Sequence, residues 1–375
     1  MKIARDATAR ASRIVTLNIA SLPSSPALLP EGEGSVESPP ERGGSWVGYR
    51  NYLFLLVFLL FAWTPITHAQ NSASVANSYP AKPVRVIVGF APGGATDIVA
   101  RLFAQKVGES LGRSFVVENR PGGGGVTATT QVLKSPADGY TLLAVSGTYT
   151  ITPAITKTLP YDSIKDLAPI SLVNQSPFLV VVHPALPAKT LRDLVTLAKA
   201  QPGKLDYGSA GQGSNVHLAV ELLNSMAGIR MTHVPYKGTG QALIDLMAGQ
   251  VQLTVANIIS ALPYAKAGRM RGLAVTSARR VKTSPEIPTV SESGVPGYEV
   301  ASWNGWLAPA ATPPEIIAKL NAELVKTAKA ADVGERMAAD GGEPLGTTPE
   351  QFRQHLIEEI ARWRKVVQVA GIRVE

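Results

Sequence analysis

The sequence has no cysteine and few charged residues, and each shortage excludes a class of protein. Without cysteine, the 375-residue chain can form neither a disulfide nor a thiolate metal site. Only 17% of its residues are charged and 45% are hydrophobic, which excludes a largely disordered chain. The formal charge is +8, but lysine and arginine never form a run of five, so no nucleic-acid partner is expected. The length allows about two globular domains.

The apolar run near the start of the chain is too short for a comfortable membrane span. It extends from Leu53 to Trp63, whereas a spanning helix needs about 20 residues. Arg50 precedes it, and Thr67-His68-Ala69 offers small residues at the positions that a signal peptidase reads. We therefore predict an exported protein whose signal peptide is cleaved after Ala69. An uncleaved amino-terminal anchor is the alternative.

Residues 1–46 precede this predicted signal peptide and are rich in Ser, Pro, Glu and Gly. A signal peptide normally begins a chain, so its position here predicts a mis-assigned start. Val47 is the candidate for the true start, because a GTG codon can initiate translation and encodes valine. We expect residues 1–69 to be a pre-sequence and signal peptide that take no part in the fold.

The stretch Val84 to Asp97, VRVIVGFAPGGATD, predicts a buried strand, a Pro-Gly-Gly turn and the start of a helix. We expect Gly93 and Gly94 to adopt backbone conformations that side chains forbid, including a positive φ at Gly94, and to leave the next amides uncovered. Thr96 or Asp97 can cap the helix. Free amides at the positive end of a helix dipole can bind an anion such as a carboxylate. An ordinary strand-to-helix connection is the alternative.

Strand and helix patterns alternate along most of the remaining chain, which predicts an α/β fold with helices covering parallel strands. The four glycines before Val126 do not have the spacing of a dinucleotide fingerprint, and a close-packed turn explains them better. The strand Tyr140 to Val145 is followed by the hydroxyl-rich loop Ser146 to Thr150. Ligands of α/β sheets gather at such carboxyl ends of strands.

The carboxyl-terminal part departs from this alternation after the proline-rich passage Ser284 to Gly297. The segment YEVASWNGWLAPA then predicts an extended chain that returns to the first domain, and two helical patterns follow. The last pattern repeats apolar residues at Phe352, Leu356, Ile360 and Trp363, the spacing of one buried helix face.

Several separate motifs agree in order and spacing with one family. They are IVGFAPGGATDIVAR, VVENRPGGGG, YGSAGQGSNVHLAVELL, and VPYKG followed by ALIDLMAGQVQL and NIISALPYAKAGRMRGLAVTS. Through them the sequence closely resembles, from about Tyr79 to its end, the Bug (TctC-like) family of periplasmic solute-binding receptors of tripartite tricarboxylate transporters.

The resemblance implies the fold of a type II periplasmic binding protein. Two α/β lobes with mixed, mainly parallel sheets would be joined by two crossing strands, with the ligand between the lobes. The crossings would lie near Val173 to Pro177 and near Val300 to Trp306. Lobe one would then comprise residues 79–175 plus 300–375, and lobe two residues 176–299.

The resemblance also implies a ligand site built from the loops after strands in both lobes. In lobe one the implied residues are Phe90, Ala91, Gly93, Gly94, Asp97, Ser146 and Thr148. In lobe two they are Ser209, Gly213, Ser214, Asn215, Tyr236, Lys237 and Asn257. The family holds a ligand carboxylate through backbone amides and ordered waters, and no arginine in these loops could form a bidentate clamp. Many relatives carry an acidic residue where this chain has Ala256, so a ligand amine would lack that partner.

A small organic carboxylate is the implied ligand, captured by hinge closure, and the permease subunits of a tripartite transporter are the implied partners. A sensor kinase is an alternative partner, because sequence does not separate delivery from signalling. We expect a monomer without a cofactor. No metal site is expected either, since no two histidines have the i, i+4 spacing of a helical pair.

Several of these residues have simpler structural interpretations. Asp97 can serve only as a helix cap, and Lys237 can lie in solvent at the rim of the cleft. His217 is expected to pack within its own lobe, and Trp303 and Trp306 to pack in the core or hinge.

A secreted enzyme is the alternative from another functional class. A nucleophile elbow would need the pattern G-x-S-x-G, but around Ser209 the chain has Tyr207 in the place of the first glycine. No Ser-His-Asp set is evident from the spacing, although one can form in space. We therefore predict a binding protein and not an enzyme.

Overall fold

The computed structural model describes residues 78–156 and 158–370. The predicted signal peptide and the candidate start at Val47 lie outside these residues. The strands are β1 Val84–Val88, β2 Phe115–Asn119, β3 Thr141–Ser146, β4 Leu167–Val182, β5 Asp206–Ser209, β6 Thr232–Pro235, β7 Leu253–Asn257, β8 Arg271–Val275, β9 Ala301–Pro309 and β10 Glu343–Pro344. The α-helices are α4 Ala95–Leu111, α5 Val126–Leu133, α6 Thr148–Ile155, α7 Leu191–Ala200, α8 Asn215–Ala227, α9 Thr239–Met247, α10 Ile258–Lys266, α11 Pro314–Ala328, α12 Ala331–Ala339 and α13 Pro349–Ala370.

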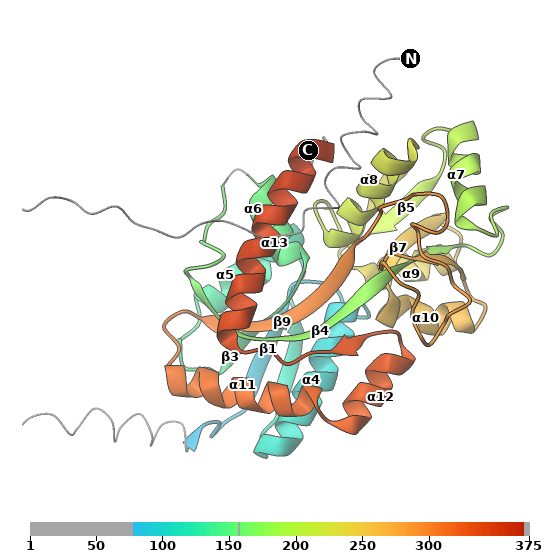
Figure 1. The fold of residues 1–375 in the computed structure, drawn as a ribbon. Coiled ribbons are helices and arrows are strands. Elements are labelled where there is room, and N and C mark those ends of the chain that lie inside the picture. Colours follow the sequence, from blue (N-terminus) through green and yellow to red (C-terminus); the bar gives the residue numbers. More distant parts are fainter. Residues whose placement is uncertain (1–77, 157, 371–375) are drawn as a thin grey trace, which may run out of the picture.

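The strands form one mixed sheet in the order β2-β1-β3-β9-β4-β7-β5-β6, with β8 and β10 also paired to β4. Figure 1 shows the long strands β4 and β9 running side by side across the molecule. The pairs β1–β2, β1–β3, β5–β6 and β5–β7 are parallel, whereas every antiparallel pairing among the described residues involves β4 or β9. The expected α/β architecture with a mixed sheet is confirmed.

Strand β4 divides this sheet into two halves. Its residues Leu167 to Pro177 pair with β9, and from Phe178 to Val182 it pairs with β7. We call β2, β1, β3, β9, β10 and the first part of β4, with their helices α4, α5, α6, α11, α12 and α13, the first half. The second half comprises β5, β6, β7, β8 and the rest of β4, with helices α7, α8, α9 and α10.

The predicted elements agree with the structure where the pattern was strongly periodic. The four apolar residues of α13 are buried, with Phe352 0%, Leu356 1%, Ile360 7% and Trp363 4% exposed. Helix α6 is different, because it begins at Thr148, inside the segment Ser146 to Thr150 that was predicted as a hydroxyl-rich loop. Its sequence TYTITPAI is β-branched and contains Pro153, both unfavourable in a helix, and its packing against α13 stabilises it.

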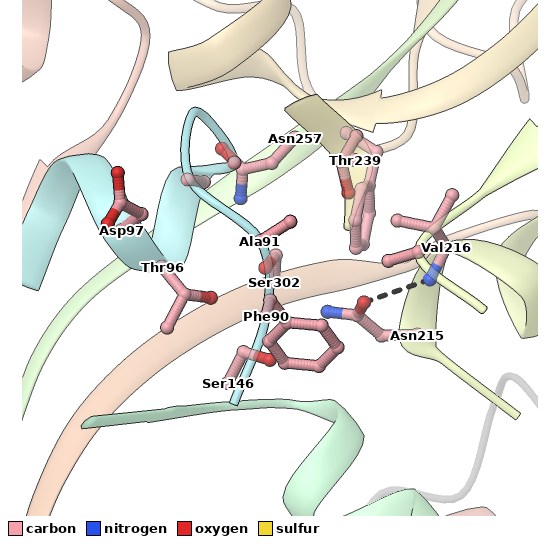
Figure 2. A pocket seen from close by; sticks show the side chains of 14 residues that line it. Phe90, Ala91, Thr96, Asp97, Ser146, Asn215, Val216, Thr239, Asn257 and Ser302 are labelled. Carbon is pink, nitrogen blue, oxygen red and sulfur yellow. Dashed lines mark hydrogen bonds between the residues drawn. The ribbon is translucent and has the colours of Figure 1, made fainter. Parts of the chain in front are cut away.

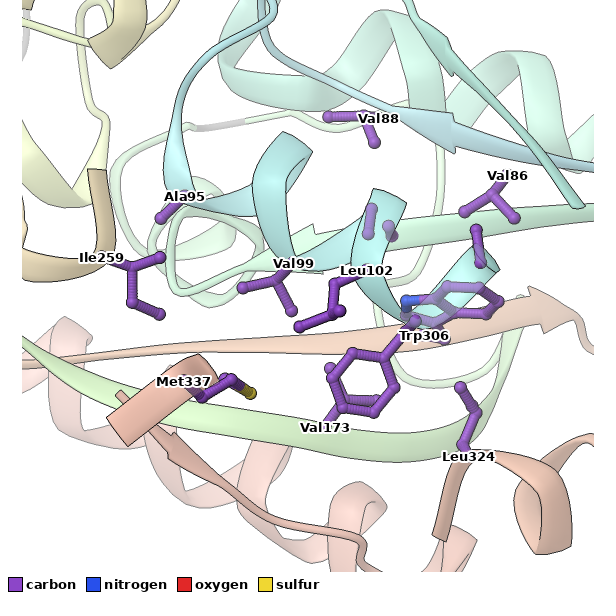
Figure 3. Packing of buried hydrophobic residues seen from close by; sticks show 14 of the residues in the cluster. Val86, Val88, Ala95, Val99, Leu102, Val173, Ile259, Trp306, Leu324 and Met337 are labelled. Carbon is purple, nitrogen blue, oxygen red and sulfur yellow. The ribbon is translucent and has the colours of Figure 1, made fainter. Parts of the chain in front are cut away.

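The largest hydrophobic cluster connects the two halves. Val86 of β1 and Val99 of α4 pack with Trp306 of β9 in the first half. Figure 3 shows Ile259, from α10 of the second half, beside Val99 and opposite Met337 of α12. The two halves therefore share apolar packing, in addition to the crossing strands.

In the described part of the chain, no helix meets the length and hydropathy needed to cross a membrane.

Candidate functional site

A cavity of about 390 Å³, part of which is open to solvent, lies between the two halves of the sheet. Seven predicted site residues line it, namely Phe90, Ala91, Gly94, Asp97, Ser146, Asn215 and Asn257. Seven residues that were not predicted line it as well, namely Ala95, Thr96, Phe178, Ala210, Val216, Thr239 and Ser302. Figure 2 shows side chains from both halves converging on this space.

Four helices begin at the cavity, and they differ in how their first amides are satisfied. Ser214 caps α8 by accepting from the His217 amide, and Asn257 caps α10 by accepting from the Ile259 amide. Helices α4 and α9 instead begin after glycines, Gly94 and Gly238, which have no side chain to cap them. Each of these two helix ends therefore presents uncapped amides and the positive end of its dipole.

The uncapped starts of α4 and α9 approach each other closely at the edge of the cavity. A Cβ atom built on Gly94 would lie 3.9 Å from the Gly240 nitrogen. One built on Gly240 would lie only 2.4 Å from the Pro92 carbonyl oxygen. The amides of Ala95, Thr96 and Thr239 have no acceptor among the described residues. Two sets of free donors from opposite halves thus border one small space.

Four buried hydroxyls border the same cavity. Thr96 is 8%, Ser146 5%, Thr239 9% and Ser302 3% exposed. None of their side chains makes a hydrogen bond within the described ranges. Because a hydroxyl can both donate and accept a hydrogen bond, these four can bind a ligand or water in the cavity.

The cavity carries no basic side chain, and its one acidic side chain is already occupied. No lysine or arginine is among the fourteen lining residues. Asp97 accepts from the Gly93 amide at 3.1 Å, from Asn119 Nδ2 at 2.9 Å and from the Arg101 guanidinium. Burial raises the pKa of Asp97, but these hydrogen bonds outweigh burial and hold it below its usual range. Figure 2 shows its carboxylate on the side of α4 away from Asn215.

The backbone of the glycine turn corrects one expectation. Gly93 adopts the left-handed region with φ +84°, whereas Gly94 has φ −83° and ψ 164°. A positive φ at Gly94 was therefore a wrong prediction. A side chain at Gly94 would meet Gly240 and Thr239 at ordinary contact distances, whereas Gly93 needs glycine for its backbone conformation.

Two predicted site residues outside the cavity join its two sides. Thr148 Oγ1, at the start of α6, accepts from the Asn215 amide at 3.1 Å. The Lys237 carbonyl accepts from the Ala91 amide at 3.0 Å, while the lysine side chain lies exposed, as its simpler interpretation expected. Both bonds connect the first half to the second.

Five further predicted residues do not line the cavity. Gly93 donates to Asp97, and the Gly213 amide donates to His217 Nδ1 at 3.1 Å. Tyr236 donates to Asp245 at 2.8 Å. Ser214 is used as the cap of α8, and Ser209 is fully buried. These residues shape the loops around the site.

Ser209 and His233 form a close pair that could be mistaken for a catalytic dyad. Ser209 Oγ lies 2.6 Å from His233 Nε2, and the His233 ring stacks on His217 at 4.0 Å between centroids. Burial lowers the pKa of both histidines to about 4. Ser209 is 0% exposed, and within the described residues no carboxylate hydrogen-bonds to His233. The pair is therefore part of the packing of the second half.

Clusters of three or more potential metal ligands are absent from the residues that the structure describes.

Comparison with known proteins identifies the family. The family model described as tripartite tricarboxylate transporter family receptor (TctC) matches residues 99–372. The chain belongs to this family. Its members are periplasmic solute-binding receptors and not enzymes, which agrees with the resemblance seen in the sequence.

The relatives match nearly along their whole length. Protein BugT of Bordetella pertussis is 37% identical over 302 residues, which cover 80% of this chain and 93% of BugT. A solved R. palustris protein with adipate is 39% identical, with a TM-score of 0.76, covering 79% of this chain and 99% of that one. MatC from Rhodopseudomonas palustris with bound malate is 34% identical, with a TM-score of 0.74, covering 77% and 100%.

Sequence reasoning missed three of the four unpaired hydroxyls. Thr96 was predicted only as a helix cap. Thr239 follows Gly238 at the start of α9, and a search for helix starts that lack a capping side chain would have found it. Ser302 lies within the crossing strand β9, where nothing local in the sequence marks it.

Proposed function

We propose that this receptor captures a small organic carboxylate between two lobes by hinge closure and delivers it to the permease of a tripartite transporter. Lobe one comprises residues 79–175 plus 300–375, and lobe two residues 176–299. The ligand site combines the predicted loops with Thr96, Thr239 and Ser302. The carboxylate lies between the uncapped starts of α4 and α9.

One observation carries this proposal. Two uncapped helix starts, one from each side, meet at a buried cavity that has free amides and unpaired hydroxyls but no cation. Helix N-termini bind anions through their amides and their dipoles. Neutral donors of this kind suit a carboxylate that must be released again, because no ion pair has to be broken.

The same arrangement couples closure to ligand binding. Each helix start carries about half a positive charge, so bringing two of them together without an anion is unfavourable, by an amount of the order of 1 kcal/mol. A carboxylate between them replaces this repulsion with two attractions. An anion therefore shifts the equilibrium toward the closed form, which is what a receptor that presents loaded ligand to a permease requires.

The ligands of similar structures support a carboxylate. The two R. palustris structures contain adipate and malate, which are both dicarboxylates. Their overall similarity to this chain makes such acids the first ligands to test. The family model, whose description names a transporter receptor, supports delivery to a permease.

A thermal-unfolding screen of the purified exported chain against mono- and dicarboxylates, including adipate and malate, tests the proposal. A ligand present at 100 times its dissociation constant should stabilise the protein by about 2.7 kcal/mol. The matched control for each acid is its uncharged methyl ester, which should have no effect. Equal stabilisation by an acid and its ester would contradict capture of a carboxylate. A panel in which no acid stabilises the protein would contradict it as well.

A further inference from the structure

We infer that the ligand site continues behind Phe90 into a second chamber, which accepts the uncharged far end of an elongated carboxylate. The inference rests on the proposed function, because the carboxylate itself is held in the first cavity. The second chamber measures about 280 Å³, part of which is open to solvent, and Phe90 and Ser146 line both spaces. Figure 2 shows these two side chains next to each other at one edge of the first cavity.

The position of the chamber in the fold favours a ligand. It lies at the carboxyl ends of β1 and β3, which are neighbours in the sheet. Val86 packs on the face covered by α4, whereas Ile87 packs with Ala128 of α5 on the opposite face. Since the helices that follow β1 and β2 cover opposite faces, the β1–β3 edge is a topological switch point, where open α/β sheets leave a crevice for ligands.

Glycines keep the chamber open. A Cβ atom on Gly125, whose φ is +96°, would meet no atom within 4 Å, so this position borders empty space. A Cβ atom on Gly89 would lie 2.7 Å from the Gly125 Cα atom, so the close approach of these two segments requires glycine. Thr129 and Tyr161 complete the wall on the side of α5.

The chemistry of the wall distinguishes the chamber from the first cavity. No charged residue is among those that line it. The first amides of α5 are occupied, since those of Gly125 and Thr127 donate to the Gly122 carbonyl and that of Val126 to Gly123. A second carboxylate would therefore be buried without a charged or free backbone partner, which is costly. An apolar chain or ring is compatible with the wall.

Hydroxyls allow this uncharged end to carry a polar group. Ser146 is only 5% exposed, and within the described residues its hydroxyl has no partner. The Tyr161 phenol shares a hydrogen bond with Thr129 and can also offer one to the ligand. The favoured ligand is a monocarboxylate with a tail of several carbons that ends in a methyl or hydroxyl group.

Calorimetry with butanoate, hexanoate, octanoate and 6-hydroxyhexanoate tests the inference. Each methylene that enters the chamber should strengthen binding by about fourfold. Thr129→Leu and Tyr161→Trp are two independent substitutions in the wall on the side of α5. Each fills the chamber and should abolish this gain while leaving butanoate binding unchanged. Thr129→Val, which removes only the hydroxyl at nearly constant volume, should keep the gain. Tyr161→Phe should reduce the preference for 6-hydroxyhexanoate over hexanoate.

The outcomes separate this inference from the proposed function. If butanoate binds but longer acids gain nothing, or if a folded filled variant keeps the gain, the chamber is not used and the inference is wrong. If only dicarboxylates such as succinate bind, the proposed function stands. The inference that the second chamber holds an uncharged tail is then wrong. If no carboxylate of any length binds, the proposed function fails, and the inference fails with it.

Discussion

The Asn215 amide donates to Thr148 Oγ1 beside the cavity, with 3.1 Å between nitrogen and oxygen. Thr148 begins α6 in the first half and Asn215 begins α8 in the second. The Ala91 amide and the Lys237 carbonyl make a second such bond at 3.0 Å. Both bonds join the two halves of the sheet, so any motion that separates the halves has to break them.

Thr148→Val should weaken ligand binding without weakening the fold of either lobe. The substitution removes the acceptor of the Asn215 amide but keeps the shape of the side chain. One lost hydrogen bond is worth about 0.5 to 1.5 kcal/mol, which is about 2- to 12-fold in the dissociation constant. Calorimetry measures the change. Thr152→Val is the control, since Thr152 donates only to the Thr148 carbonyl within α6, and a similar loss in both variants would contradict a bridging role.

Gly240→Ala should prevent full closure. Its Cβ atom would lie 2.4 Å from the Pro92 carbonyl oxygen, so the lobes would have to stay apart by a fraction of an ångström or more. Alanine is otherwise favourable in a helix, so the variant should fold normally and bind ligand at least tenfold more weakly. Gly334→Ala in α12 meets no atom within 4 Å and is the matched control. Unchanged affinity in a folded Gly240→Ala protein would show that the contact is not needed.

Asp97→Asn should weaken carboxylate binding even though it removes a negative charge from the site. The Asp97 carboxylate holds the Gly93 amide and pairs with Arg101, so its loss loosens the loop that precedes the free amides of α4. We expect a loss of about 0.5 to 1.5 kcal/mol in binding. Glu109→Gln, on the same helix but at the surface, controls for charge alone. Tighter binding by Asp97→Asn would mean that the carboxylate mainly repels the ligand.

The stability of the protein should fall between pH 6.5 and about 4. Burial lowers the pKa of His217 and His233 to about 4, whereas an unfolded histidine titrates near 6.5. In this range the unfolded state binds protons that the folded state does not, so the stability present above pH 6.5 is lost as the pH falls. Urea unfolding of the parent and of a His217→Gln, His233→Gln double variant measures this. The double variant should show a shallower decline, and equal slopes would contradict the assignment.

The sequence predicted the parts of the fold that depend on local patterns. The strand, turn and helix start from Val84 to Asp97 and the buried face of α13 follow directly from periodicity and glycine. Helix α6 could not be predicted, because its β-branched sequence with Pro153 favours other conformations and only its packing on α13 makes it helical.

The site was harder to predict than the fold, because its donors are defined by competition within the structure. Ser214 and Asn257 carry suitable side chains but use them as caps, and Thr148 uses its hydroxyl to join the two sides. Ser302 reaches the cavity only because β9 pairs with β4 between the lobes. Which polar group stays free depends on contacts between segments far apart in the chain.

A carboxylate held between the starts of α4 and α9 is tested most directly by the response of backbone amides to ligand. The labelled protein is titrated with a carboxylate identified in the thermal screen, and its amide signals are followed by nitrogen–proton NMR. We expect the amide signals of Thr96 and Thr239, one from each proposed lobe, to shift together and to saturate at one equivalent. The amide of Glu315, in the first turn of α11, serves as the control and should not move. Shifts confined to one lobe, or saturated binding that leaves both threonine amides unchanged, would contradict a carboxylate held between the starts of α4 and α9.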